Sequence, residues 1–103
     1  MQMKAYSAQD KLIVSLDGEI AHHSAAEIRE GLDKMIAVSR PKVMVLELSG
    51  IDFMDSSGLG LVLGRYRRLN EMGSQMVIKN PGARTEKILA MAGVDKLIKI
   101  IRS

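Results

Sequence analysis

The sequence predicts one α/β domain, with helices packed on a single mixed β-sheet and elements in the order ββαβαβαβ. Short apolar runs of strand length alternate with stretches whose apolar residues recur at helical spacing. The chain has 103 residues, of which 47% are hydrophobic and 26% charged, as expected for one globular core. Because helices connect successive strands, we expect the later strands to be parallel neighbours joined by right-handed crossovers.

The N-terminal part is predicted to form a β-hairpin followed by a helix. Turn-forming residues at positions 6–10 precede an alternating strand pattern at 12–16. Ser24 is expected to cap the helix, because Glu27 three residues later completes a capping-box pattern. Arg40, which precedes a proline, is expected to end it. The apolar residues at helical spacing in this segment are Ala25, Ile28, Leu32, Met35 and Ile36.

The C-terminal part repeats the alternation of strand and helix. Residues 43–48 form a nearly continuous apolar run, typical of a buried parallel strand. Residues 49–55 are predicted to form a loop that leads into a second amphipathic helix. The remaining expected elements are that helix from Leu59 to its end at Gly73, a strand at Gln75–Lys79, a turn at Asn80–Gly82, a helix at Thr85–Met91 ended by Gly93, and a last strand at Lys96–Ile101.

Composition excludes several classes of protein. The chain has no cysteine, so a disulfide framework, a thiolate nucleophile and a cysteine zinc site are excluded. The net charge of +3 is small, and the aromatic residues Tyr6, Phe53 and Tyr66 are too scattered to stack nucleic-acid bases. No apolar run approaches the length of a membrane span, and the polar start lacks a signal-peptide core. We therefore expect a cytoplasmic protein without a nucleic-acid or membrane partner.

The most informative segment is residues 53–60, Phe-Met-Asp-Ser-Ser-Gly-Leu-Gly. It brings a carboxylate and two hydroxyls to a helix N-terminus, where unpaired amides and the helix dipole favour capping side chains and anions. Capping alone accounts for one such residue. Two serines, an acid and a neighbouring apolar pair exceed that requirement, which indicates a recognition site on an exposed loop.

This segment, continued by Leu63-Gly64-Arg65-Tyr66, resembles the signature of the bacterial anti-sigma factor antagonists, which belong to the STAS-domain family. Residues 18–20 and the pair His22-His23 also match, and the resemblance extends over nearly the whole chain. It implies one STAS domain over residues 1–103, in which Ser56 is phosphorylated by a serine-kinase anti-sigma factor and Ser57 caps the helix. The partner-binding loop that it implies comprises Phe53, Met54, Asp55, Ser57, Gly58 and Leu59.

The resemblance also implies a function. The unphosphorylated protein is expected to bind the anti-sigma factor and release a sigma factor, and phosphorylation of Ser56 is expected to end that binding. A serine phosphatase would restore the active form, and no cofactor is implied. Two departures from the family pattern stand out. Ala21 replaces an aspartate that the family often has, and little sequence remains after the last strand for the family's final helix.

Other interpretations of the same residues carry less weight. His22 and His23 point opposite ways on an extended backbone and have no third ligand, so no metal site is expected. A serine hydrolase is disfavoured, because Met54 occupies the first glycine position of a nucleophile elbow and both histidines precede the serine. A STAS subunit of a stress-signalling assembly or a transporter regulator would share the fold and loop but not the partner, and the sequence does not exclude this alternative.

Two features of the second helix concern packing and charge. The spacing of Gly60 and Gly64 predicts close packing of this helix on a neighbour. The arginines at 65, 67 and 68 are interpreted as a solvated face, on which one pair is available to a partner.

Overall fold

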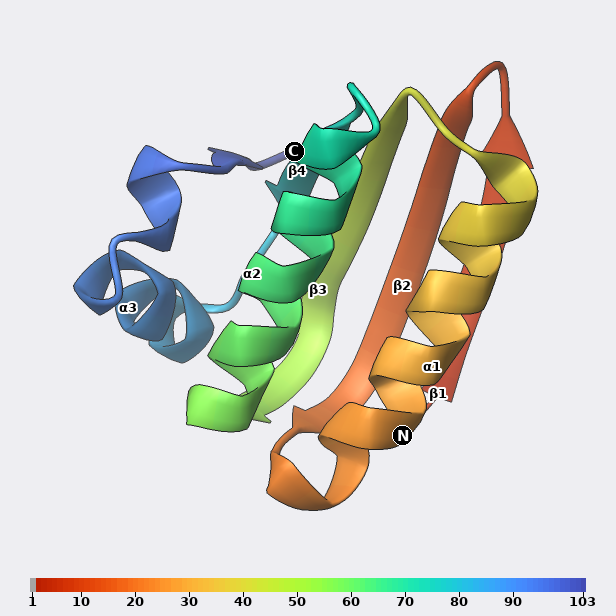
Figure 1. The fold of residues 1–103 in the computed structure, drawn as a ribbon. Coiled ribbons are helices and arrows are strands. Elements are labelled where there is room, and N and C mark those ends of the chain that lie inside the picture. The colour runs from red at the N-terminus through yellow and green to blue at the C-terminus, as the bar shows by residue number, and fades with distance from the viewer. Residues whose placement is uncertain (1) are drawn as a thin grey trace.

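Five strands form one mixed sheet in the order β1-β2-β3-β4-β5 in the computed structural model, which describes residues 2–103 (Figure 1). The strands β1 and β2 are antiparallel, and each later strand runs parallel to its neighbour. The predicted order of elements is confirmed, with one added 3₁₀ helix, η1. The elements are β1 (Gln2–Ala8), β2 (Lys11–Ile20), α1 (His22–Ser39), β3 (Val43–Met54), α2 (Ser56–Glu71), β4 (Gln75–Lys79), α3 (Ala83–Met91), η1 (Val94–Lys96) and β5 (Lys99–Ile101).

The core lies between the sheet and its helices. Helices α1 and α2 lie side by side over the sheet, and both begin at the same end of it (Figure 1). Helix α3 contacts β3, whose pairing with β4 ends at Glu47. Apolar side chains fill this layer, and its fully buried members include Val14, Leu16, Ile28, Leu32, Leu46, Leu69 and Leu89.

The central strand β3 is longer than expected. The predicted strand at 43–48 is confirmed, but the predicted loop at 49–55 is wrong, because β3 continues to Met54. Polar and glycine residues in this half of β3 interrupt the apolar pattern, yet they pair with an equally irregular half of β2. The pairing reaches Ile20↔Met54, with register shifts near Asp17 and Gly18. Pairing with a neighbouring strand therefore overrides the local signal for a loop.

Helix α1 begins earlier than expected, at His22. Ala21 occupies the N-cap position, and the predicted cap at Ser24 is wrong. Ser24 lies inside the first turn, where its hydroxyl accepts a hydrogen bond from the Ala21 amide at 3.1 Å. The hydroxyl also lies 3.0 Å from the Glu19 carbonyl, to which it donates. The predicted end is confirmed, since Arg40 is the C-cap, with a φ of 42°.

The other boundaries differ by a few residues. The hairpin turn consists of Gln9 and Asp10, both at positive φ, so strand β1 includes Tyr6. Near the C-terminus the predicted strand at 96–101 shortens to β5, because η1 follows Gly93. None of the helices within residues 2–103 is long and apolar enough to cross a membrane.

Candidate functional site

The carboxylate of Asp55 holds the starts of both helices. Asp55 is the N-cap of α2, and its Oδ1 accepts hydrogen bonds from the amides of Ser57 at 2.9 Å and Gly58 at 3.3 Å. Its Oδ2 accepts a third hydrogen bond, at 3.1 Å, from the amide of His22 in the first turn of α1. Because Ala21 has no side-chain acceptor, Asp55 satisfies an amide of both helices.

These contacts determine the charge state of Asp55. Desolvation raises the pKa of its carboxyl, but the amides of His22, Gly58 and Ser57 together outweigh that effect. The pKa of Asp55 therefore lies below its usual value. Hydrogen bonds to the ionised form account for this direction, and Asp55 stays negatively charged at neutral pH.

Ser56 is the first residue of α2, and its side chain is exposed. Ser56 lies between the N-cap residue Asp55 and the rest of helix α2, which together fix the backbone at Ser56. Ser57, the next residue, is half-buried and donates its amide to Asp55. The prediction that Ser57 caps the helix is therefore wrong, since Asp55 performs that role.

The remaining residues of the predicted loop are not a loop. Phe53 and Met54 end strand β3, whereas Gly58 and Leu59 lie in the first turns of α2. Phe53 is 39% exposed, but Met54 is 1% exposed because successive strand residues point to opposite faces. Met54 therefore supports the site from inside, and its expected role as an exposed contact is wrong. Leu59 is half-buried against the core.

Gly58 is buried where α2 meets the sheet. A Cβ at this position would lie 2.5 Å from Cγ of Met54 and 2.7 Å from the carbonyl oxygen of Ile20. Gly58 thus permits a close approach within the domain rather than contact with an outside surface. At Gly60 and Gly64 nothing lies within 4 Å of such a Cβ, so the predicted close packing at these two glycines is wrong.

The arginines of α2 do not form one solvated face. The side chain of Arg65 is 12% exposed, and its Nε lies 3.0 Å from Oδ1 of Asp33 on α1. Arg68 approaches the same oxygen at 3.4 Å, whereas Arg67 is exposed. Asp33 and Arg65 are far apart in the chain, and no local pattern in the sequence signals that they meet.

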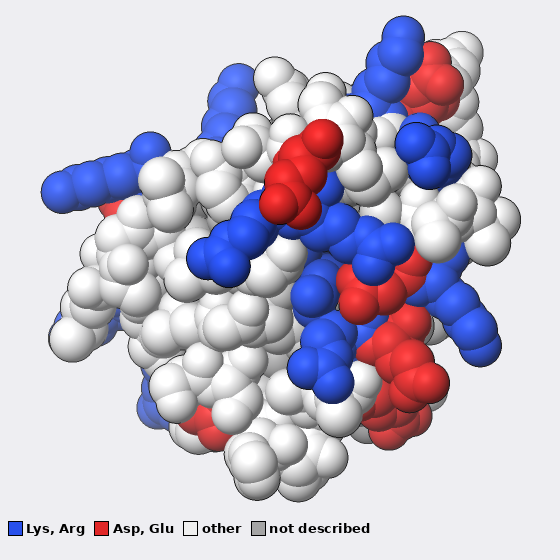
Figure 2. Space-filling view, in the orientation of Figure 1, with Lys and Arg blue, Asp and Glu red and all other residues white. Residues whose placement is uncertain are grey.

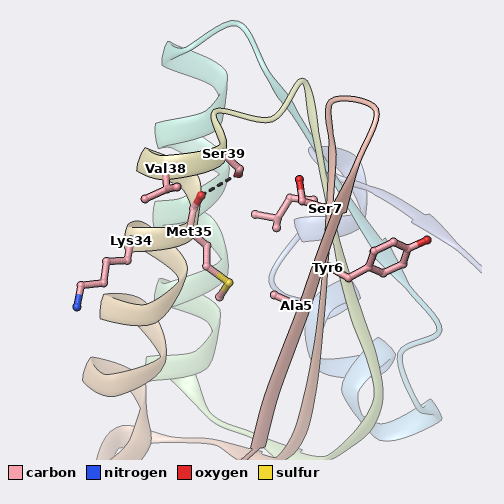
Figure 3. Close-up of a pocket in the computed structure, with 8 residues that line it drawn as sticks. Ala5, Tyr6, Ser7, Lys34, Met35, Val38 and Ser39 are labelled. Atoms are coloured by element: carbon pink, nitrogen blue, oxygen red, sulfur yellow. Dashed lines mark hydrogen bonds between the residues drawn. The ribbon is translucent and has the colours of Figure 1, made fainter.

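Two of the hollows along α1 lie near its opposite ends. The α1–α2 groove, of about 400 Å³, lies between the N-terminal half of α1 and helix α2 and is lined in part by Ser57. An apolar hollow of about 340 Å³ lies between β1 and the C-terminal half of α1, where Ala5 and Val38 border it and Tyr6 points away (Figure 3). Charged side chains of both signs gather over α1 and α2 (Figure 2). Within residues 2–103, no three His, Asp or Glu side chains are grouped to hold a metal ion.

The described chain is similar to known proteins over nearly its whole length. The family model described as the STAS domain matches residues 2–103. The anti-sigma F factor antagonist of Paenibacillus polymyxa is 35% identical, over 97% of this chain and 86% of that protein. The unphosphorylated structure of the anti-sigma factor antagonist SpoIIAA has a TM-score of 0.85 and 25% identity, over 99% of this chain and 88% of that one. The phosphorylated form of Bacillus SpoIIAA has a TM-score of 0.77 and 25% identity, over 99% and 91%.

Proposed function

Since the chain belongs to the STAS-domain family and to its anti-sigma factor antagonists, we propose that its activity is switched by phosphorylation of Ser56. The unphosphorylated form binds a serine-kinase anti-sigma factor in the cytoplasm and thereby frees a sigma factor. The kinase phosphorylates Ser56 and ends the binding, and a serine phosphatase restores it. The regulatory role of this group agrees with the expectation that the chain is not an enzyme.

The observation that carries this proposal is the position of Ser56, exposed at the first residue of a helix whose start is fixed by Asp55. A phosphate there adds about −1.5 to −2 charges and three acceptor oxygens. The positive end of the helix dipole tolerates that charge, so the fold survives the modification. Binding is lost because the contact surface around Ser56 and Phe53 becomes bulky and negative.

The similarity to SpoIIAA in both states supports this view. The fold of this chain matches the unphosphorylated form with a TM-score of 0.85 and the phosphorylated form with a TM-score of 0.77. This chain is similar in fold to SpoIIAA in both forms, which is compatible with a switch that changes the surface and preserves the fold. Asp55 then serves as the residue that presents Ser56 to the kinase.

The test compares two neighbouring serines. After incubation with the cognate kinase and ATP, mass mapping is expected to place phosphate on Ser56. Ser56→Ala should abolish the labelling, and Ser57→Ala, the matched control, should retain it. Phosphate on Ser57, or full labelling of Ser56→Ala, would overturn the assignment.

Calorimetry with the anti-sigma factor tests the switch itself. Wild type should bind most tightly, Ser56→Asp more weakly, and the phosphoprotein most weakly, because aspartate supplies one charge where phosphoserine supplies nearly two. Circular dichroism should show the same helix content in all three. A phosphoprotein that binds as tightly as wild type would contradict the proposed switch.

A further inference from the structure

The α1–α2 groove has the size and the lining of a binding site. It is open because alanines of α1 and Gly60 of α2 leave room between the helices. No atom lies within 4 Å of the position that a Cβ of Gly60 would take. Its polar lining comes from His22, Arg29, Ser57 and Arg65. The groove therefore combines space with groups that are cationic or that donate hydrogen bonds.

The arginines of the groove lack a full set of carboxylate or hydrogen-bond partners. Arg29 is exposed, and within residues 2–103 no carboxylate lies within ion-pair distance of it. Nε of Arg65 lies within ion-pair distance of Asp33, yet neither Nε nor Nη1 of Arg65, both buried, has a hydrogen-bond acceptor within residues 2–103. Burial lowers the pKa of Arg65, Asp33 opposes that shift, and the positive charges of Arg29 and Arg68 add to it. Two arginines that repel each other thus border one hollow.

Two helix N-termini and two carboxylates surround the groove. Both helices begin at the same end of the sheet, so the positive ends of their dipoles converge beside the groove (Figure 1). The carboxylate of Asp55 at this end already accepts hydrogen bonds from three amides. At the other end, Asp33 is shared by Arg65 and Arg68. Neither carboxylate lies within ion-pair distance of Arg29, so Arg29 remains free to pair with an outside anion.

We propose that the α1–α2 groove binds an oxyanion, a carboxylate or a phosphate group, through Arg29 and Arg65. A guanidinium group presents paired donors that match the oxygens of either anion. The anion would relieve the repulsion between the two arginines. It comes either from an acidic side chain of a docked protein or from a free phosphate-bearing molecule. Because Ser57 lines the groove, the site adjoins the phosphoacceptor Ser56.

The first experiment needs no partner. Isotope-labelled protein is titrated with inorganic phosphate and, separately, with acetate at constant ionic strength, while the amide signals of Ser57 and Gly60 and the Nε–H signal of Arg65 are followed by NMR. Saturable shifts at these groups are expected with at least one of the anions. Arg29→Gln should weaken the binding about ten-fold, as expected for loss of a charged hydrogen-bonding partner. Arg67→Gln, an exposed arginine of α2 outside the groove, should leave it unchanged.

Two results would overturn the proposal. One is the absence of saturable shifts with both anions. The other is an equal loss for Arg29→Gln and Arg67→Gln, because the anion would then respond to the general surface charge. Arg29 is exposed and has no ion pair in the described chain, so its replacement should not unfold the protein, and circular dichroism checks this.

A second experiment identifies the source of the anion, and it rests on the proposed function. If a partner supplies a carboxylate, Arg29→Gln should weaken the complex with the anti-sigma factor, and phosphate should compete with that complex. If the ligand is a free phosphate-bearing molecule, Arg29→Gln should lose phosphate binding and keep its affinity for the partner. Either result supports the oxyanion site. Failure of the wild type to bind any anti-sigma factor would contradict the proposed function alone, because the NMR titration tests the groove independently.

Discussion

Replacement of Gly58 by alanine tests how tightly α2 is seated on the sheet. The new methyl group would lie 2.5 Å from Cγ of Met54 and 2.7 Å from the carbonyl oxygen of Ile20. The methionine side chain can move, but the carbonyl belongs to the backbone and also accepts the Asp55 amide at 3.3 Å. The methyl group therefore pushes apart the end of β2 and the start of α2.

The magnitude follows from two opposing effects. Overpacking of a tight site costs about 1–3 kcal/mol. Alanine is favoured over glycine within a helix by at most about 1 kcal/mol. Because both contacts lie under 3.0 Å, we take the overpacking cost as about 2–3 kcal/mol. Less about 1 kcal/mol for the helix preference, Gly58→Ala should lower the free energy of unfolding by about 1–2 kcal/mol, which corresponds to a fall in Tm of roughly 5–15 °C for a domain of this size.

Gly64→Ala is the matched control in the same helix. Nothing lies within 4 Å of a Cβ at Gly64, so only the helix preference acts there. This variant should gain about 0.5–1 kcal/mol. Urea unfolding of both variants with wild type gives the two differences directly. If Gly58→Ala is as stable as Gly64→Ala, the steric argument is wrong.

Three further predictions concern the charges and caps. Ser57→Ala should change the free energy of unfolding by less than about 0.5 kcal/mol in urea titrations, because Asp55 caps α2; a loss near 1 kcal/mol would return the capping role to Ser57. The pKa of Asp55 is lowered in the folded state, so its stabilisation is complete above its usual pKa of 3.8 and is lost as the pH falls through the folded pKa. Asp55→Asn, which can still cap, should therefore flatten the decline of stability between about pH 5 and pH 2, and an unchanged decline in acid unfolding would contradict the assigned hydrogen bonds. Asp33→Ala should cost about 1–3 kcal/mol in chemical denaturation, because it leaves the guanidinium group of Arg65 buried without its counter-charge; no loss would mean that water already solvates that group.

The sequence predicts the order of the elements because that order depends on local periodicity. The helical spacing in α1 and the apolar run at 43–48 can each be recognised within a short stretch of sequence. The start of α2 is also marked locally, by the Asp-Ser-Ser-Gly segment. The identity of its cap is not, because Asp55 and Ser57 are both good capping residues and only the backbone path selects between them.

The features that the sequence does not predict depend on distant partners. The second half of β3 is a strand because β2 pairs with it, although its own residues indicate a loop. Arg65 of α2 can be buried because Asp33 of the neighbouring helix α1 faces it. The α1–α2 groove likewise arises from small residues on different helices. Its arginines come to line one groove only when those helices pack together.

The carboxylate of Asp55 has an evolutionary consequence, because it serves two helices at once. Residue 21 sits at the N-cap of α1 without an acceptor of its own, and Asp55 compensates for it through the His22 amide. Positions 21 and 55 are therefore expected to show epistasis, since contacts within one network are not additive. In a chain with an acceptor at position 21, replacement of Asp55 would disturb one helix. In this chain the same replacement disturbs two, so Asp55 is harder to replace here.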